Sequence, residues 1–127
     1  MSEITTEILL PEPDMEFLEE KGYNYVLIQE GGTIHLILSN FPFSEAFKPQ
    51  QADILIMFPA GYPNAKLDMF WTFPEIRLQD GALPAATEHR QDFYGKTWQR
   101  WSRHGSWRGG TDNLRSFISS IRKEIYG

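Results

Sequence analysis

The chain has 127 residues, of which 41% are hydrophobic and 23% are charged, and this composition predicts one domain spanning residues 1–127 with its own core and excludes an intrinsically disordered protein. The formal net charge of -5 argues against a nucleic-acid-binding protein, and the absence of cysteine excludes disulfides, thiolate metal sites and thioester intermediates on this chain. No apolar run is long enough to cross a membrane, and the acidic N-terminus is unlike a signal peptide. We therefore expect a cytoplasmic protein with no membrane contact and no cofactor.

The first predicted element is a short helix within residues 10–23, LPEPDMEFLEEKGY. Pro13 and Asp14 suit the first turn of a helix, and Gly22 suits the left-handed residue that ends one. The carboxylates of this helix are expected to form a solvated acidic face, which consists of Asp14, Glu16, Glu19 and Glu20.

Four strands are predicted after this helix. The stretches 24–30 and 33–40 flank a Gly-Gly pair, which indicates a two-residue hairpin turn. The stretch 52–59 is apolar on both faces, as is typical of a central strand, and it ends at a proline that cannot donate to a sheet. The stretch 67–74 is rich in aromatic residues and also ends at a proline. Sequential strands of this kind favour an antiparallel meander.

Residues 75–110 lack periodicity but are rich in aromatic residues and cations, which predicts a long functional loop and not a disordered segment. A C-terminal helix is predicted within residues 111–127, where Thr111 or Asp112 can cap the first turn. The apolar residues of this helix have the spacing of a single stripe, which consists of Leu114, Phe117, Ile118, Ile121 and Ile125. The predicted fold is therefore of the α+β class.

The order of these elements resembles that of the ubiquitin-conjugating (UBC) fold, and residues 58–76, FPAGYPNAKLDMFWTFPEI, sharpen the resemblance. In the UBC family a Phe-Pro-x-x-Tyr-Pro segment closes the third strand and leads into an aromatic fourth strand. The corresponding residues here are Phe58, Pro59, Tyr62 and Pro63. The resemblance implies a four-stranded antiparallel meander, a short N-terminal helix, a long catalytic-type loop and a C-terminal helix, with Tyr62 and Pro63 holding the turn beside the loop.

The expected catalytic loop also has the layout of this family. There, a Gly-x-x-Cys segment is followed by a tryptophan that precedes the next helix. The segment GKTW, residues 95–98, followed by Trp107 matches that layout except at the cysteine. Together with residues 10–23, the segment TWQRWSRH, residues 97–104, is similar to the prokaryotic group E conjugating-enzyme-like proteins, a bacterial branch of the family.

Members of that branch are encoded beside ubiquitin-like proteins, ThiF-type activating enzymes and metallopeptidases. The resemblance thus implies a component of a bacterial ubiquitin-like protein conjugation pathway, for which phage defence is one setting. Its implied partners are a ubiquitin-like protein and a ThiF-type activating enzyme.

The chain departs from the family pattern at the residues that carry the chemistry. When Gly95 is placed on the family glycine, Trp98 stands where the cysteine nucleophile belongs, and an indole cannot accept an acyl group. The family's His-Pro-Asn triplet is also missing, so its side-chain amide does not stabilise an oxyanion here, and His89 and Arg90 are the nearest polar candidates. A cysteine mechanism is therefore excluded.

One hypothesis is a conjugating enzyme that uses oxygen instead of sulfur. Ser102 lies two residues before His104, and Arg100 and Arg103 lie on either side of the serine. A serine activated by His104 as base or orienter, with the two arginines as electrostatic stabilisers, would carry the modifier as an oxyester. Because a hydroxyl is far less acidic than a thiol, this mechanism requires a base within hydrogen-bond reach.

The alternative is a non-catalytic UBC-like scaffold that binds a ubiquitin-like protein or its activating enzyme. In this hypothesis the indoles of Trp98, Trp101 and Trp107 fill the loop, and each N–H finds a hydrogen-bond partner. The recognition surface would consist of Arg100, Arg103 and Arg108, with His89 and Tyr62 beside it. Truncation of Trp98, Trp101 and Arg103 is expected to cost the most affinity.

The sequence argues against a nucleic-acid site and against a metal site. Aromatic residues interleaved with arginines would also suit a nucleic acid, but the acidic net charge of the chain argues against it. His89 and His104 have carboxylates near them in sequence, but without cysteine or compact ligand spacing no metal site is expected. His35 lies on the polar side of the second predicted strand and is expected to be exposed.

Overall fold

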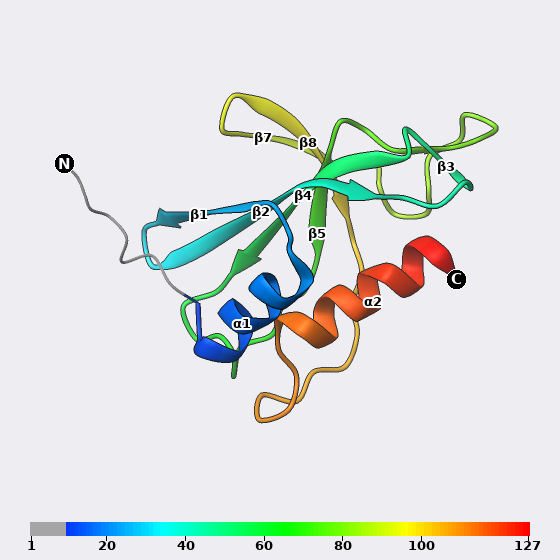
Figure 1. The fold of residues 1–127 in the computed structure, drawn as a ribbon. Coiled ribbons are helices and arrows are strands. Elements are labelled where there is room, and N and C mark those ends of the chain that lie inside the picture. Colours follow the sequence, from blue (N-terminus) through cyan, green and yellow to red (C-terminus); the bar gives the residue numbers. More distant parts are fainter. Residues whose placement is uncertain (1–9) are drawn as a thin grey trace.

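A computed structural model describes residues 10–127 as an α+β fold with an antiparallel sheet of six strands, a small sheet of two strands, and two helices that lie on one face of the large sheet (Figure 1). The elements, in chain order, are α1 (Glu12–Lys21), β1 (Tyr25–Glu30), β2 (Thr33–Pro42), β3 (Phe47–Lys48), β4 (Gln51–Phe58), β5 (Phe70–Phe73), β6 (Arg77–Leu78), β7 (Arg90–Phe93), β8 (Lys96–Trp101) and α2 (Leu114–Tyr126). The large sheet has the strand order β1-β2-β4-β5-β8-β7, and β3 pairs with β6.

The four strands expected from the sequence correspond to β1, β2, β4 and β5, but the large sheet continues beyond them. Strand β8 pairs with β5, and β7 pairs with β8, both antiparallel. The prediction of a four-stranded sheet followed by one long loop over residues 75–110 is therefore corrected, because this stretch holds the β7–β8 hairpin. The sequence of β8 shows no alternation of apolar and polar residues, because buried side chains lie on both faces of the strand. These are Trp98, Gln99 and Trp101, each 1% exposed.

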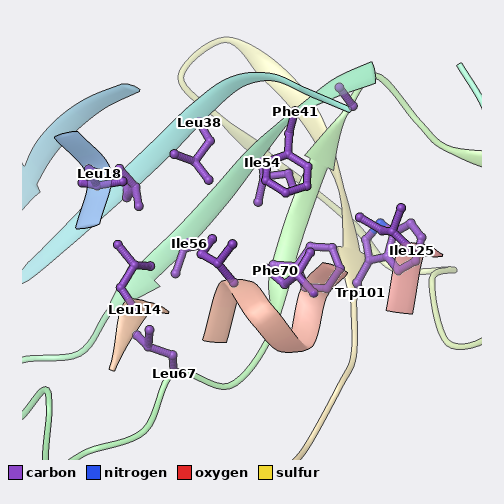
Figure 2. Close-up of a cluster of buried hydrophobic side chains, with 14 of the residues drawn as sticks. Leu18, Leu38, Phe41, Ile54, Ile56, Leu67, Phe70, Trp101, Leu114 and Ile125 are labelled. Carbon is purple, nitrogen blue, oxygen red and sulfur yellow. The ribbon is translucent and has the colours of Figure 1, made fainter. Parts of the chain in front are cut away.

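The main core lies between the large sheet and the two helices. Figure 2 shows labelled side chains from both layers pointing toward one another, among them Leu18 of α1, Ile56 of β4 and Leu114 of α2. All three are 0% exposed. Removing such side chains from water is the main source of stability for a domain of this size, and it fixes α2 against β5 and β8.

The two helices largely match their sequence predictions. Gly22 ends α1 with a left-handed φ of 69°, as expected. The predicted apolar stripe of α2 is confirmed, because four of its five members are at most 2% exposed and Phe117 is half-buried. The N-cap differs from the prediction. Asn113 caps α2 through a reciprocal pair of hydrogen bonds with Ser116, in place of Thr111 or Asp112.

Asp14 corrects the expectation of a fully solvated acidic face on α1, because this residue is 1% exposed. Its Oδ2 accepts a hydrogen bond from the Tyr62 hydroxyl at 2.6 Å, and its Oδ1 accepts one from the backbone N–H of Leu114 at 3.2 Å. The carboxylate thus joins α1, the loop after β4 and the first residue of α2. Burial raises the pKa of Asp14, and these two hydrogen bonds oppose the rise.

The β7–β8 hairpin bends over the face of the large sheet opposite the helices. Phe93 of β7 packs edge-on against Trp71 of β5, with ring centroids 5.1 Å apart. The hydroxyl of Tyr94, at the hairpin tip, hydrogen-bonds Nδ1 of His35 on β2 at 2.5 Å. These contacts bury Trp98 in a second, smaller hydrophobic cluster. They also leave His35 only 7% exposed, which corrects the expectation of a surface histidine.

The burial of His35 is expected to make folding stability depend on pH. Burial lowers the pKa of His35 below its ordinary value of 6.5, and the nearby charge of Glu30 opposes that effect. The folded chain therefore binds this proton less readily than the unfolded chain. Stability is retained above about pH 6.5 and falls as the pH drops below that value, until the lower pKa of the folded state is passed.

Urea unfolding followed by circular dichroism, compared at about pH 7.5 and about pH 5.5, measures this loss. The variant His35→Gln should show a smaller difference between the two conditions, because it removes the titrating group while keeping a polar side chain beside Tyr94. A variant with the same pH dependence as the parent chain would contradict the prediction.

Candidate functional site

A groove of about 270 Å³ lies between α2 and the segment that connects it to β8. Residues 103–107 form one wall, and α2 forms the other. Leu67 and Phe70, which lie before and at the start of β5, contribute an apolar floor. We name this the His104 groove, because His104 is at its wall.

Trp107 anchors the connecting segment to the turn that follows β4. Its Nε1 donates to the carbonyl of Pro63 at 2.8 Å, and its ring centroid lies 6.2 Å from that of Tyr62. Gly109 allows the closest approach, because a Cβ there would lie 2.9 Å from the Cα of Asn64. The Tyr-Pro turn therefore determines where the first wall of the groove stands.

His104 and Asp68 form a polar pair at this groove. Nδ1 of His104 lies 2.9 Å from Oδ1 of Asp68, and Nζ of Lys66 lies 3.6 Å from the same oxygen. The His104 side chain is 59% exposed, and within residues 10–127 its Nε2 has no hydrogen-bond partner. A histidine oriented by a carboxylate through one nitrogen can act as a general base through the other. The sequence analysis missed Asp68, which lies 36 residues before His104.

Ser102 and Ser106 lie on either side of His104 in sequence but differ in position. Ser106 lines the His104 groove, whereas Ser102 does not. Ser102 follows β8 directly, and its backbone N–H donates to the carbonyl of Ala86 at 3.1 Å. Among residues 10–127, neither serine hydroxyl is hydrogen-bonded to His104. Ser106 is a second candidate nucleophile that sequence reasoning overlooked.

Arg103 lines the groove, and its guanidinium already has several partners. Its Nε pairs with Glu124 of α2 at 2.9 Å, and its Nη1 donates to the carbonyl of Ala85 at 2.9 Å. The guanidinium carbon also lies 5.3 Å from the ring centroid of Trp101. Arg103 thus fastens the connecting segment to α2, and Glu124 neutralises part of its charge.

Arg100 and His89 lie outside the groove. The backbone N–H of Arg100, on β8, donates to the carbonyl of His89 at 3.0 Å. The Nε of Arg100 is buried and has no hydrogen-bond partner within residues 10–127. The His89 ring packs edge-on against Trp71, with centroids 6.0 Å apart. Of the two arginines expected beside the serine, the structure places only Arg103 in the groove with His104.

Trp98 and Trp101 are core residues, each 1% exposed, so their indoles fill the interior of the fold. Trp98 donates from Nε1 to the carbonyl of Phe93 at 3.0 Å, and Trp101 donates from Nε1 to Oγ1 of Thr72 at 2.9 Å. Trp98 also belongs to β8 and not to a catalytic loop. Gly95, with a φ of 76°, makes the hairpin turn that leads directly into β8.

Tyr62 and Arg108 complete the predicted binding residues. Tyr62 is half-buried, its hydroxyl donates to Asp14, and burial raises its pKa. Arg108 is exposed, and its backbone N–H donates to Oδ2 of Asp112 at 2.7 Å in the turn before α2. The side chain of Arg108 is thus an exposed charge, whereas Tyr62 holds the fold together.

A metal site and a membrane-spanning helix are both missing from residues 10–127. No three histidine, aspartate or glutamate side chains of this part are placed to hold a metal ion. Its helices, α1 and α2, are too short and too polar to cross a bilayer.

Comparison with known proteins places the chain in a family. Residues 10–126 match the model of the family described as Prokaryotic E2 family E, so the match includes both helices, the large sheet and the His104 groove. No curated protein and no solved structure matches the chain. Since the match extends over nearly the whole chain, this protein belongs to Prokaryotic E2 family E.

Proposed function

We propose that this chain carries a ubiquitin-like protein in a bacterial conjugation pathway and holds it as an oxyester on the hydroxyl of Ser102. The family supports an E2-like role, with a ubiquitin-like modifier and an activating enzyme as partners. The absence of cysteine excludes a thioester on this chain, and a serine hydroxyl can hold the acyl group as an oxyester instead. The observation that carries the proposal is the contact between His104 and Asp68, because a serine nucleophile requires an oriented base of this kind.

In the proposed step, Oγ of Ser102 attacks the C-terminal carbonyl carbon of the modifier, which the activating enzyme delivers as a thioester. As the O–C bond forms, the hydroxyl proton passes to Nε2 of His104. Because the two side chains are not hydrogen-bonded in the free chain, this step requires them first to move within hydrogen-bond reach. The C–S bond then breaks, and that proton passes to the leaving thiolate. An amine of the target later attacks the oxyester, forms an amide and returns a hydrogen to Oγ. Because the activating enzyme consumes ATP, we place the reaction in the cytoplasm.

The neighbouring charges have separate roles in this proposal. Asp68 keeps the His104 ring oriented through Nδ1 and stabilises its protonated form. Arg103, at the groove wall, stabilises the negative charge that develops on the carbonyl oxygen. Arg100 lies outside the groove, so we assign it no part in that step.

Mixing the chain with its ubiquitin-like partner, the activating enzyme and ATP is expected to give a covalent adduct on a denaturing gel that alkali or hydroxylamine cleaves. Ser102→Ala should abolish the adduct, and His104→Ala should slow its formation about 100-fold, the smallest loss typical of removing a general base. The control Ser39→Ala changes an exposed serine within β2 and should leave the rate unchanged.

Ser106→Ala separates the two hydroxyls beside His104. Loss of the adduct in this variant, with retention in Ser102→Ala, would move the nucleophile to the groove-lining serine. An adduct that survives both substitutions would contradict an oxyester on the connecting segment.

A non-catalytic scaffold is the second candidate function. The observation that favours it is the burial of Trp98, the residue aligned with the family cysteine, inside β8. This function requires binding without transfer. Titration calorimetry would then detect a complex with the ubiquitin-like protein or its activating enzyme, and the denaturing gel would show no alkali-labile band.

A further inference from the structure

A second groove, of about 490 Å³, lies between α2 and the end of α1, and we name it the basic groove. Its charged walls are Lys21 of α1 and Arg115 and Arg122 of α2, and its floor includes Phe17 and Tyr23. The basic groove and the His104 groove share no lining residue. An α-helix turns once every 3.6 residues, and at this repeat the α2 residues that line one groove project from the opposite side of the helix to those that line the other. The grooves therefore lie on opposite flanks of α2.

The basic groove carries positive charge in an acidic chain, whose formal net charge is -5. Within residues 10–127, Glu20 is the only carboxylate that pairs with its cations. Oε1 of Glu20 lies 2.9 Å from Nη2 of Arg115, and its Oε2 lies 4.0 Å from Nζ of Lys21. Arg122 has no carboxylate partner in that part of the chain. Three cations share one carboxylate, so the groove keeps a surplus of positive charge.

Aromatic rings hold both guanidinium groups of the basic groove in place. The guanidinium carbon of Arg115 lies 4.8 Å from the ring centroid of Phe17, and that of Arg122 lies 5.0 Å from the ring centroid of Tyr126. A stacked guanidinium keeps its N–H edge available for an acceptor. Because stacking restrains these long side chains before binding, less conformational entropy is lost when a carboxylate arrives.

We propose that the basic groove docks an acidic segment of a partner protein. The segment supplies two carboxylates, which pair with Arg115 and Arg122 through the fork geometry that guanidinium and carboxylate groups share. An apolar side chain between the carboxylates packs against Tyr23. Docking displaces Glu20, which occupies Arg115 in the free chain.

The charge around the groove favours a protein segment over a nucleic acid. Glu16 and Glu19 are exposed on the same helix as Lys21, and together with the net charge they repel a long polyphosphate. The cations are also confined to one groove and do not form the basic stripe typical of a nucleic-acid surface. This docking does not depend on oxyester chemistry at Ser102.

A fluorescein-labelled peptide of glutamates flanking a leucine tests the proposal, with fluorescence anisotropy measuring its dissociation constant. Arg115→Gln and Arg122→Gln should each weaken binding about threefold, and the double variant about tenfold, as for partly exposed ion pairs. Glu20→Gln should tighten binding about threefold, because it frees Arg115. Lys123→Gln is the matched control: it removes the same charge from the next position of α2, outside the groove, and should leave the constant unchanged.

Backbone amide shifts measured by NMR should be largest at the residues that line the basic groove. Three results would overturn the proposal. In the first, Lys123→Gln weakens binding as much as Arg122→Gln does. In the second, a peptide with glutamine in place of glutamate binds as tightly as the acidic peptide. In the third, a single-stranded oligonucleotide or inorganic phosphate shifts the same amides at the same concentration, which would make the groove a nucleic-acid site or a small-anion site.

Discussion

Replacing Trp101 with alanine is expected to lower the free energy of unfolding by about 4 kcal/mol, within the range for truncation of a buried tryptophan. The residue is 1% exposed, and its ring stacks on that of Phe70 with centroids 5.2 Å apart. The substitution also removes the hydrogen bond to Thr72 and the ring over which the Arg103 guanidinium lies. Urea unfolding followed by circular dichroism measures the loss.

Trp107→Ala is the matched comparison for this experiment. Its indole is only half-buried and makes its hydrogen bond to the carbonyl of Pro63, at the edge of the core. We expect a smaller loss of about 2 kcal/mol, because less apolar area returns to water. A loss at Trp101 no larger than the loss at Trp107 would contradict the central position of Trp101 in the core.

Replacing Asp14 with alanine is expected to lower the free energy of unfolding by about 3 kcal/mol, because it leaves one buried and one half-buried donor without an acceptor. These donors are the Tyr62 hydroxyl and the Leu114 backbone N–H. Asp14→Asn should lose less, since the amide oxygen can still accept from Leu114. Glu16→Ala, at an exposed position of the same helix, should change stability by no more than about 0.5 kcal/mol.

The pH dependence of folding stability, compared between the parent chain and Asp14→Asn, provides a second measurement. Burial raises the pKa of Asp14 above its ordinary value of 3.8, so the folded chain keeps this proton to higher pH than the unfolded chain. The stabilisation that the protonated carboxyl of Asp14 contributes to folding is complete below pH 3.8. It is lost as the pH rises through the higher pKa of the folded state. Relative to Asp14→Asn, the parent chain should therefore lose stability as the pH rises through this interval. A constant difference between the two chains would mean that Asp14 is solvated.

The helices and the first strands could be predicted from the sequence because each has a local signal. The apolar stripe of α2 follows the helical repeat, and Gly22 marks the end of α1. The β7–β8 hairpin has no such signal. Trp98 and Trp101 face different clusters, and Gln99 between them is buried because its side-chain amide pairs with the backbone of Ile76. A strand covered on both faces, with a buried polar residue, shows no alternation in sequence.

The candidate site was only partly predictable for a related reason. The contact of Trp107 with Tyr62 and Pro63 lies where the resemblance to the UBC family placed those residues. The pairing of Asp68 with His104 brings together residues with no shared motif, and the burial of Asp14 depends on partners 48 and 100 residues away. Contacts of this kind are created by the topology of the sheet and helices, so local sequence patterns do not reveal them.

Helix α2 is a wall of both grooves, and this shared wall would link the two proposed binding equilibria. An occupant of the basic groove that shifts or stiffens α2 changes the affinity of the His104 groove by some factor. By thermodynamic reciprocity, an occupant of the His104 groove then changes the affinity of the basic groove by the same factor. If both proposals hold, one helix of 13 residues allows a docked acidic partner and a bound modifier to favour or exclude each other without touching.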